Sequence, residues 1–264
     1  MSRTEGGVPL YDAFGERYDL MVDWPARIAR ESPFFEAIFR QVDARRALDA
    51  GCGTGWHAAH FARLGLEVVG ADPSAEMIRL ARAHGAGQSN PRFLQAGLGE
   101  LRAAVEGQFD VLTCLGNTLP HLPDEAALAA ALADAQDVLR PGGALVIQQL
   151  NYDRILAQRQ RFLGVNSRTE GGAEHLFFRF YDFPVGGEPG GRLTFNLATF
   201  TKPAEGGVWS FRVDSTSLQL ITADQLRRAL ADAGFAEVRM LGDYQGSDFD
   251  PAASSDLVVV ARKP

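Results

Sequence analysis

The stretch Leu48-Asp49-Ala50-Gly51-Cys52-Gly53-Thr54-Gly55 joins a short apolar run to a segment with helical spacing. Glycines at such a junction let the backbone adopt positive φ angles and approach a ligand closely. The free N–H groups at the start of the following helix then face the same ligand. The stretch therefore predicts a cofactor-binding loop between a strand over residues 46–50 and a helix over residues 56–64.

Apolar runs and helical patterns alternate after this loop. Further strands are predicted over residues 66–71, 92–95, 109–115 and 144–149, and further helices over residues 75–84 and 124–139. Strands separated by helices of this length indicate an α/β fold with a parallel sheet and helices on both faces. The core resumes near the end of the chain, with a helix over residues 222–233 and strands over residues 236–241 and 256–261. Thr222 and Gln225 resemble a capping box for that helix.

Two other parts flank or interrupt this core. Residues 11–42 look helical, with Ser32-Pro33 as a plausible helix start before Phe34, Phe35, Ile38 and Phe39. After Asn151, glycine pairs at 171–172, 186–187, 190–191 and 206–207 separate β-type segments over 176–183, 192–201 and 208–220. We therefore expect an N-terminal helical cap (1–44), a core (45–150 and 221–264) and an inserted antiparallel β lid (151–220).

The overall composition excludes some kinds of function. The chain has 264 residues, a net charge of -7 and 46% hydrophobic residues. A nucleic-acid partner is not expected, because binding a polyanion requires a basic surface. Two cysteines, Cys52 and Cys114, are too few for a disulfide framework or a four-ligand metal site, so no metal is expected. We see no signal peptide and no membrane-spanning run, so a cytoplasmic protein is expected.

The glycine loop alone fits two cofactors. Dinucleotides bind the pattern G-x-G-x-x-G, but here the third glycine comes one residue early. Asp49 stands just before the glycines, where a carboxylate would repel a pyrophosphate and suit a ligand with an ammonium group. Asp72 ends the second strand and can accept hydrogen bonds from ribose hydroxyls, which both dinucleotides and S-adenosylmethionine carry. A dinucleotide and S-adenosylmethionine both remain open at this point.

Four motifs in order resemble class I S-adenosylmethionine-dependent methyltransferases. They are Leu48-Asp-Ala-Gly-Cys-Gly-Thr-Gly55, Val69-Gly-Ala-Asp-Pro-Ser74, Phe109-Asp-Val-Leu112 and Leu139-Arg-Pro-Gly-Gly143. The resemblance covers the whole chain and implies a seven-stranded Rossmann-like sheet with S-adenosylmethionine as cofactor. It also implies that the last strand, over residues 256–261, is antiparallel and lies beside the fifth.

Within this class the chain looks most like the glycine/sarcosine N-methyltransferase group. The shared stretches begin at Tyr18-Asp-Leu-Met, Cys114-Leu-Gly-Asn, Asn151-Tyr-Asp and Leu241-Gly-Asp-Tyr. The resemblance implies direct in-line methyl transfer to a small molecule, with an amine nitrogen as acceptor. A small-molecule O-methyltransferase is the nearest alternative. An NAD-dependent oxidoreductase and a non-catalytic cofactor-binding module are alternatives of other classes.

The resemblance also implies roles for individual residues around the cofactor. Tyr11, Tyr18, Trp24 and Arg27 would close over it, and Arg27 would pair with the methionyl carboxylate. Gly51 would lie against the methionyl part, Asp72 would hold the ribose, Met77, Gly97 and Leu98 would contact the adenine, and Leu115 would offer a backbone carbonyl. Asp49 and Gly53 are further candidates for cofactor binding. Gly97 stands where many relatives carry a side chain for the adenine amine, which leaves that contact to the backbone of Leu98.

Candidates for the acceptor site follow the fourth strand. Asn117 could accept a hydrogen bond from a substrate amine, and His121 could act as a base near neutral pH. Tyr152, Tyr181 and Tyr244 could line the acceptor pocket. The tetrad Leu115-Gly116-Asn117-Thr118 differs from the Asn/Asp-Pro-Pro-aromatic motif of DNA-base amino methyltransferases, so a small organic acceptor is the better fit.

The chain departs from the glycine/sarcosine group just before Asn151-Tyr-Asp. The group has Asp-His-Arg there, and its arginine grips the substrate carboxylate, whereas this chain has Gln148-Gln149-Leu150. Leucine cannot pair with a carboxylate, and the loss of a buried charge partner costs on the order of 3–5 kcal/mol. We therefore expect Leu150 to line the acceptor pocket. Glycine itself is then a doubtful substrate.

Overall fold

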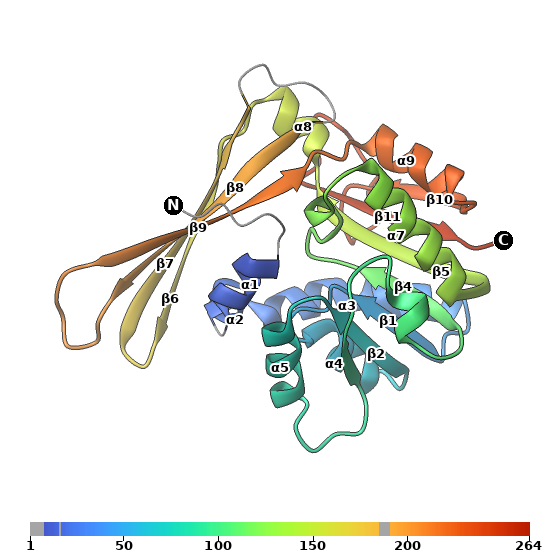
Figure 1. Ribbon diagram of the computed structural model, residues 1–264, viewed down its shortest axis with the longest axis horizontal. Coiled ribbons are helices and arrows are strands. Elements are labelled where there is room, and N and C mark those ends of the chain that lie inside the picture. Colours follow the sequence, from blue (N-terminus) through green and yellow to red (C-terminus); the bar gives the residue numbers. More distant parts are fainter. Residues whose placement is uncertain (1–7, 16, 185–190) are drawn as a thin grey trace.

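A computed structural model describes residues 8–15, 17–184 and 191–264 (Figure 1). Its centre is a seven-stranded sheet with the order β10-β11-β5-β4-β1-β2-β3. These strands are β1 (Arg46–Ala50), β2 (Glu67–Asp72), β3 (Arg92–Gln95), β4 (Phe109–Cys114), β5 (Leu139–Leu150), β10 (Ala236–Leu241) and β11 (Asp256–Arg262). The first five are parallel, and β11 is antiparallel to both β5 and β10. The predicted fold class and the predicted place of the last strand are confirmed.

Helices cover both faces of this sheet. The helices of the described residues are, in chain order, α1 (Val8–Phe14), α2 (Arg17–Met21), α3 (Trp24–Gln41), α4 (Trp56–Arg63), α5 (Ala75–His84), α6 (Leu101–Ala104), α7 (Glu125–Val138), α8 (Tyr152–Ala157) and α9 (Ala223–Asp232), with a short 3₁₀ helix η1 (Leu119–His121). Phe35 of α3 and Phe61 of α4 belong to the apolar cluster on one face. Leu132 of α7 and Leu226 of α9 belong to the cluster on the other face. None of the helices in the described part of the chain is long and apolar enough to cross a membrane.

Short-range hydrogen bonds set where these helices begin. The Thr222 side chain accepts from the Gln225 N–H, and the Gln225 side chain accepts from the Thr222 N–H, so the predicted capping box is present. At α5, the Ser74 hydroxyl accepts from the Met77 N–H at 3.1 Å. These caps satisfy N–H groups that the helix itself leaves without partners. The α5 cap also fixes the backbone just after β2.

The predicted helix start at Ser32-Pro33 is wrong. The helix α3 begins at Trp24, where the Asp23 carboxylate accepts from the Ala26 N–H at 3.2 Å, and Pro33 lies inside it. Proline removes one backbone donor, but a buried apolar stripe can hold such a helix together. Phe35 and Ile38 supply that stripe here. The early start places Trp24, Arg27 and Glu31 on one helix.

Four strands, β6 (Phe162–Glu170), β7 (Ala173–Asp182), β8 (Arg192–Lys202) and β9 (Ser210–Gln219), form a separate antiparallel sheet. Figure 1 shows this inserted sheet extending away from the core, with α1 and α2 beside it. The strand β6 was absent from the sequence prediction, because its residues are mostly polar and exposed. The inner face of the sheet packs on the N-terminal helices through Phe177, Leu197 and Phe14. Residues 1–7 and 16 of the predicted cap, and the predicted turns at 186–187 and Gly190, lie outside the described residues.

Candidate cofactor and acceptor site

The glycine loop lies at the carboxyl end of β1, in the middle of the sheet. Gly51 has a φ of +73°, and a Cβ atom there would lie 2.5 Å from Cγ2 of Thr118. Only glycine fits at a position with both restrictions. The N–H of Gly53 donates to Oδ2 of Asp72 at 2.9 Å. The loop is thereby joined to the end of β2 on one side and to the segment after β4 on the other.

A cavity of about 260 Å³ lies over this loop. It brings together most of the residues predicted to bind the cofactor: Tyr11, Tyr18, Gly51, Gly53, Asp72, Met77, Gly97, Leu98 and Leu115. Pro73, Ser74, Gly116, Thr118, His121 and Leu122 complete its lining. We call it the loop cavity.

Asp72 is held in place at the edge of the loop cavity. Its Oδ1 accepts from the Ser74 N–H at 2.9 Å, and its Oδ2 accepts from Gly53. Burial raises the pKa of this carboxyl to about 6. No lysine or arginine lines the loop cavity among the described residues, so a pyrophosphate would meet a carboxylate and no cation. These residues fit a cofactor that has ribose hydroxyls and lacks phosphate.

Three predicted cofactor residues lie outside the lining of the loop cavity. Trp24 stacks on Trp56 with ring centres 5.8 Å apart, and its Nε1 donates to Asp19 at 2.8 Å. Arg27 lies beside Trp24, 5.3 Å from the ring centre, and lines the neighbouring cavity instead. Asp49 is buried beneath the loop, and its Oδ1 accepts from the Thr113 hydroxyl at 2.7 Å. The Oδ2 atom of Asp49 is buried without a hydrogen-bond partner among the described residues.

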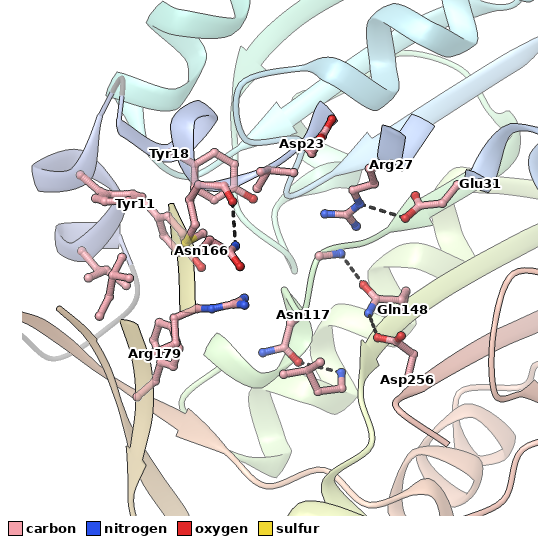
Figure 2. A pocket seen from close by; sticks show the side chains of 18 of the residues that line it. Tyr11, Tyr18, Asp23, Arg27, Glu31, Asn117, Gln148, Asn166, Arg179 and Asp256 are labelled. Carbon is pink, nitrogen blue, oxygen red and sulfur yellow. Dashed lines mark hydrogen bonds and ion pairs between the residues drawn. The ribbon is translucent and has the colours of Figure 1, made fainter. Parts of the chain in front are cut away.

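A larger cavity of about 530 Å³ opens between the N-terminal helices, the inserted sheet and the ends of β4 and β5 (Figure 2). We call it the lid cavity. Asn117, Leu150 and Tyr244, three of the predicted acceptor residues, line it. The two cavities share the residues Tyr11, Tyr18, Gly116 and His121 in their linings. These four residues therefore border both cavities.

His121 and Tyr11 form part of this shared wall. The Tyr11 hydroxyl lies 3.0 Å from Nε2 of His121, and the two rings meet edge to face. Burial, together with the charge of Arg192, lowers the pKa of His121 to about 4. The ring is therefore neutral at pH 7 and holds a proton weakly, which disfavours the general-base role expected from the sequence.

Asn117 is occupied by structural hydrogen bonds. It has a φ of +67°, directly after Gly116 at +71°, a conformation that asparagine tolerates better than most residues. Its Oδ1 accepts from the Leu150 N–H at 3.0 Å, and its Nδ2 lies 3.0 Å from the Tyr152 hydroxyl. Asn117 therefore ties the segment after β4 to the end of β5, and its carbonyl already has a partner.

Two of the three predicted acceptor tyrosines do not line either cavity. Tyr152 and Tyr181 are both 0% exposed and pack in one apolar cluster with Leu193 and Leu218. They are buried because α8 and the base of the inserted sheet pack on each other at this point. Only Tyr244 reaches the lid cavity.

Several lining residues of the lid cavity were not predicted. Glu31 accepts from Arg27 at 2.9 Å and lies 2.8 Å from Nε2 of His57. Gln148 donates to Asp256 at 2.7 Å and accepts from the Gly116 N–H. The inserted sheet adds Asn166 from β6 and Arg179 from β7, as Figure 2 shows. The available signal for Arg179 was strand alternation, because Phe177, Arg179 and Tyr181 share one face of β7.

Comparison with known proteins agrees with this architecture. A family model described as a methyltransferase domain matches residues 47–143. The glycine/sarcosine N-methyltransferase of Parasynechococcus marenigrum is 31% identical over 90% of this chain and 79% of its own length. The enzyme of the same name from Halorhodospira halochloris is 28% identical over 91% of this chain and 84% of its own length. A solved amino pentose methyltransferase from Micromonospora echinaspora, with S-adenosylmethionine bound, shares the fold at a TM-score of 0.71, with 22% identity over 97% of each chain.

The strand order and the methyltransferase-domain match are those of a class I S-adenosylmethionine-dependent methyltransferase. The likeness to the Parasynechococcus enzyme extends over most of both chains. The chain therefore belongs to the glycine/sarcosine N-methyltransferase family within that class.

Proposed function

We propose that this protein transfers a methyl group from S-adenosylmethionine to the amine nitrogen of a small molecule larger than glycine. The observation that carries the proposal is the shared wall of the two cavities at Tyr11, Tyr18, Gly116 and His121. The lid cavity, at about 530 Å³, has the volume of pockets that hold whole small molecules. The amine acceptors in the names of the relatives support nitrogen as the site of methylation.

The residues of the loop cavity suit the proposed cofactor. Asp72 would hold the ribose hydroxyls, and Met77 and Leu98 would flank the adenine. Arg27 would hold the methionyl carboxylate from the side of the lid cavity. When bound, this cofactor supplies a methyl group on a positively charged sulfur.

The protein's own contribution would be placement and exclusion of water. A carbon–nitrogen bond forms as the carbon–sulfur bond breaks, so the acceptor nitrogen must present its lone pair in line with that bond. Tyr11, Tyr18 and Gly116 would frame the point where the nitrogen approaches. The product ammonium loses its proton to solvent, and a neutral His121 would stabilise the acceptor by position rather than by accepting that proton.

Glycine is a poor match for the lid cavity. Leu150 stands at the position of the family's carboxylate-binding arginine and lines the cavity with an apolar side chain. A two-carbon acceptor would also leave most of a cavity of about 530 Å³ to water. We therefore infer that the acceptor is larger and bears its polar groups elsewhere.

O-methylation is the competing proposal. A ubiquinone biosynthesis O-methyltransferase of Xanthomonas oryzae is 37% identical, but over only 40% of this chain. The purified protein should be incubated with S-adenosylmethionine and matched amines, phenols and carboxylic acids, while release of S-adenosylhomocysteine is measured. We expect turnover with amines and an N-methyl product by mass spectrometry. Turnover confined to phenols would replace this proposal by O-methylation, and binding of S-adenosylhomocysteine without any turnover would indicate a non-catalytic module.

A further inference from the structure

Arg179 is a cation at an inward position of the inserted sheet. On β7 it alternates with Phe177 and Tyr181, both 0% exposed, and it pairs across the sheet with Leu197, which is 2% exposed. Its Nε is buried without a hydrogen-bond partner, and no carboxylate of the described residues forms an ion pair with it. Figure 2 shows its guanidinium extending from the sheet into the lid cavity.

The other arginines that line the lid cavity have anionic partners. Arg27 lies 2.9 Å from Glu31, and Arg30 lies 3.3 Å from the same carboxylate. Arg168 lies 3.6 Å from Asp23. Arg179 is thus the exception among the described arginines of this lining. A half-buried cation without a counter-charge is costly, and an anionic ligand would remove that cost.

We infer that Arg179 binds an acidic group of the methyl acceptor, so that the acceptor is an amine that also carries a carboxylate. This inference rests on the proposed function and deepens it. The amine end would lie where the two cavities meet, at Gly116 and His121, and the acid end would lie at the inserted sheet. A guanidinium holds a carboxylate through two parallel hydrogen bonds, which fixes the acceptor's orientation.

The rest of the lid cavity is consistent with such an acceptor. Leu150, Phe195 and Leu218 line it with apolar side chains that can contact the body of the molecule. Asp256, which has no ion pair among the described residues, lies on the far side of the cavity from Arg179 in Figure 2 and would repel a carboxylate bound in the opposite direction. Leu150 replaces the arginine that the family resemblance implies, and Arg179 supplies a cation from a different strand.

The test uses Arg179→Leu and Arg179→Lys, with Arg212→Leu as the matched control. Arg212 is on β9 of the same sheet, but it is exposed and pairs with Asp214 at 2.6 Å. Methyl transfer is measured for β-alanine against β-alaninamide and for 4-aminobenzoate against 4-aminobenzamide. Binding of propionate and benzoate to the protein saturated with S-adenosylhomocysteine is measured separately by calorimetry, because it requires no turnover.

We expect each acid to have a KM roughly 10- to 100-fold lower than that of its amide, the effect of a charged hydrogen bond. Arg179→Leu should abolish this difference in KM. Arg179→Lys should recover part of it, and Arg212→Leu should behave as wild type. S-adenosylhomocysteine affinity should stay within twofold in all variants. If it falls in Arg179→Leu, the arginine serves the cofactor and the inference is overturned.

The two proposals can fail separately. Amine methylation without a preference for acids, or a preference that survives in Arg179→Leu, overturns the role of Arg179 and leaves the proposed function standing. Binding of propionate or benzoate that depends on Arg179, without methylation of any amine, overturns the proposed function and supports the anion site. Wild-type protein that binds neither acid and shows no preference in turnover overturns the inference.

Discussion

Tyr11 and His121 are 110 positions apart in the chain, yet they share a hydrogen bond of 3.0 Å where the two cavities meet. This bond joins α1 to η1, the short helix after β4. A second connection lies nearby, because Asp19 of α2 accepts from the Thr54 hydroxyl of the glycine loop at 2.6 Å. The N-terminal helices are therefore fastened to the two core segments that would contact the cofactor.

Tyr11→Phe tests the first connection. The substitution keeps the ring and removes the hydroxyl, so we expect affinity for S-adenosylhomocysteine to fall by about 0.5–1.5 kcal/mol. Tyr181→Phe is the matched control, because the Tyr181 hydroxyl is buried without a partner among the described residues and Tyr181 lines neither cavity. Calorimetry checks both. Equal affinity of Tyr11→Phe and wild type would show that the bond does not hold the site together.

Asp72 makes cofactor binding depend on pH. Its pKa of about 6 is above the ordinary value of 3.8, so the free protein protonates this carboxyl as the pH falls through about 6. Bound ribose hydroxyls would favour the ionised form, and S-adenosylhomocysteine should bind more weakly below pH 6 than above pH 7.

The control for this pH dependence is Asp72→Asn. It should bind the ligand more weakly by roughly 1–3 kcal/mol at neutral pH and lose the change near pH 6. A variant with the wild-type affinity would mean that the ribose lies elsewhere.

The raised pKa of Asp72 also predicts how this carboxyl affects folding stability. Its contribution to the free energy of unfolding is complete below pH 3.8 and is lost as the pH rises through about 6.

Glu31 is a structural anion at the wall of the lid cavity. It is 1% exposed and contacts both Arg27 and His57. Burial opposes ionisation of Glu31, but the hydrogen bond from His57 and the charge of Arg27 outweigh it and keep its pKa below 4.5. Its stabilising contribution should therefore be present above pH 4.5 and disappear as the pH falls through the lowered pKa.

Glu31→Gln should lower the free energy of unfolding by about 3–5 kcal/mol, because it leaves Arg27 without its buried counter-charge. Glu36→Gln is the control, since the Glu36 side chain is 41% exposed, lies 3.6 Å from Arg40 and, among the described residues, accepts a hydrogen bond only from Ser32; its effect should be about 0–1 kcal/mol. Urea denaturation measures both. Similar losses in the two variants would argue that the buried cluster adds no stability.

Leu150→Arg tests why glycine fits this protein poorly. We expect wild-type protein to methylate glycine slowly and the variant to lower the KM for glycine at least about tenfold, by analogy with a charged hydrogen bond. Leu150→Met, which adds no charge, should leave that KM unchanged. Efficient glycine methylation by the wild type would contradict the argument from position 150.

The sequence predicted the core of this protein well because its signals are local. Strands such as β3 and β10 have the predicted bounds, and the capping box at Thr222 needs only four residues. The lid cavity depends instead on contacts between distant segments. Tyr152 and Asn117 look like acceptor-binding residues in the sequence, but in the structure their side chains form a hydrogen bond with each other.

Arg179 is a cavity-lining residue that the sequence did not predict. Its neighbours in the sequence resemble any half-exposed strand, and its lack of a counter-charge is visible only when the facing residues are known. The strand β6 was missed for another reason, because its residues are mostly polar and exposed and show no apolar face in the sequence.

The residues that line both cavities affect the order in which ligands bind and leave during a reaction cycle. Tyr11 and Tyr18 belong to both linings, so they cannot adjust to one ligand without changing the space offered to the other. We expect a compulsory sequence in steady-state kinetics, with S-adenosylmethionine entering first and S-adenosylhomocysteine leaving last. Product-inhibition patterns would reveal this order, and release of S-adenosylhomocysteine before the methylated product would contradict it.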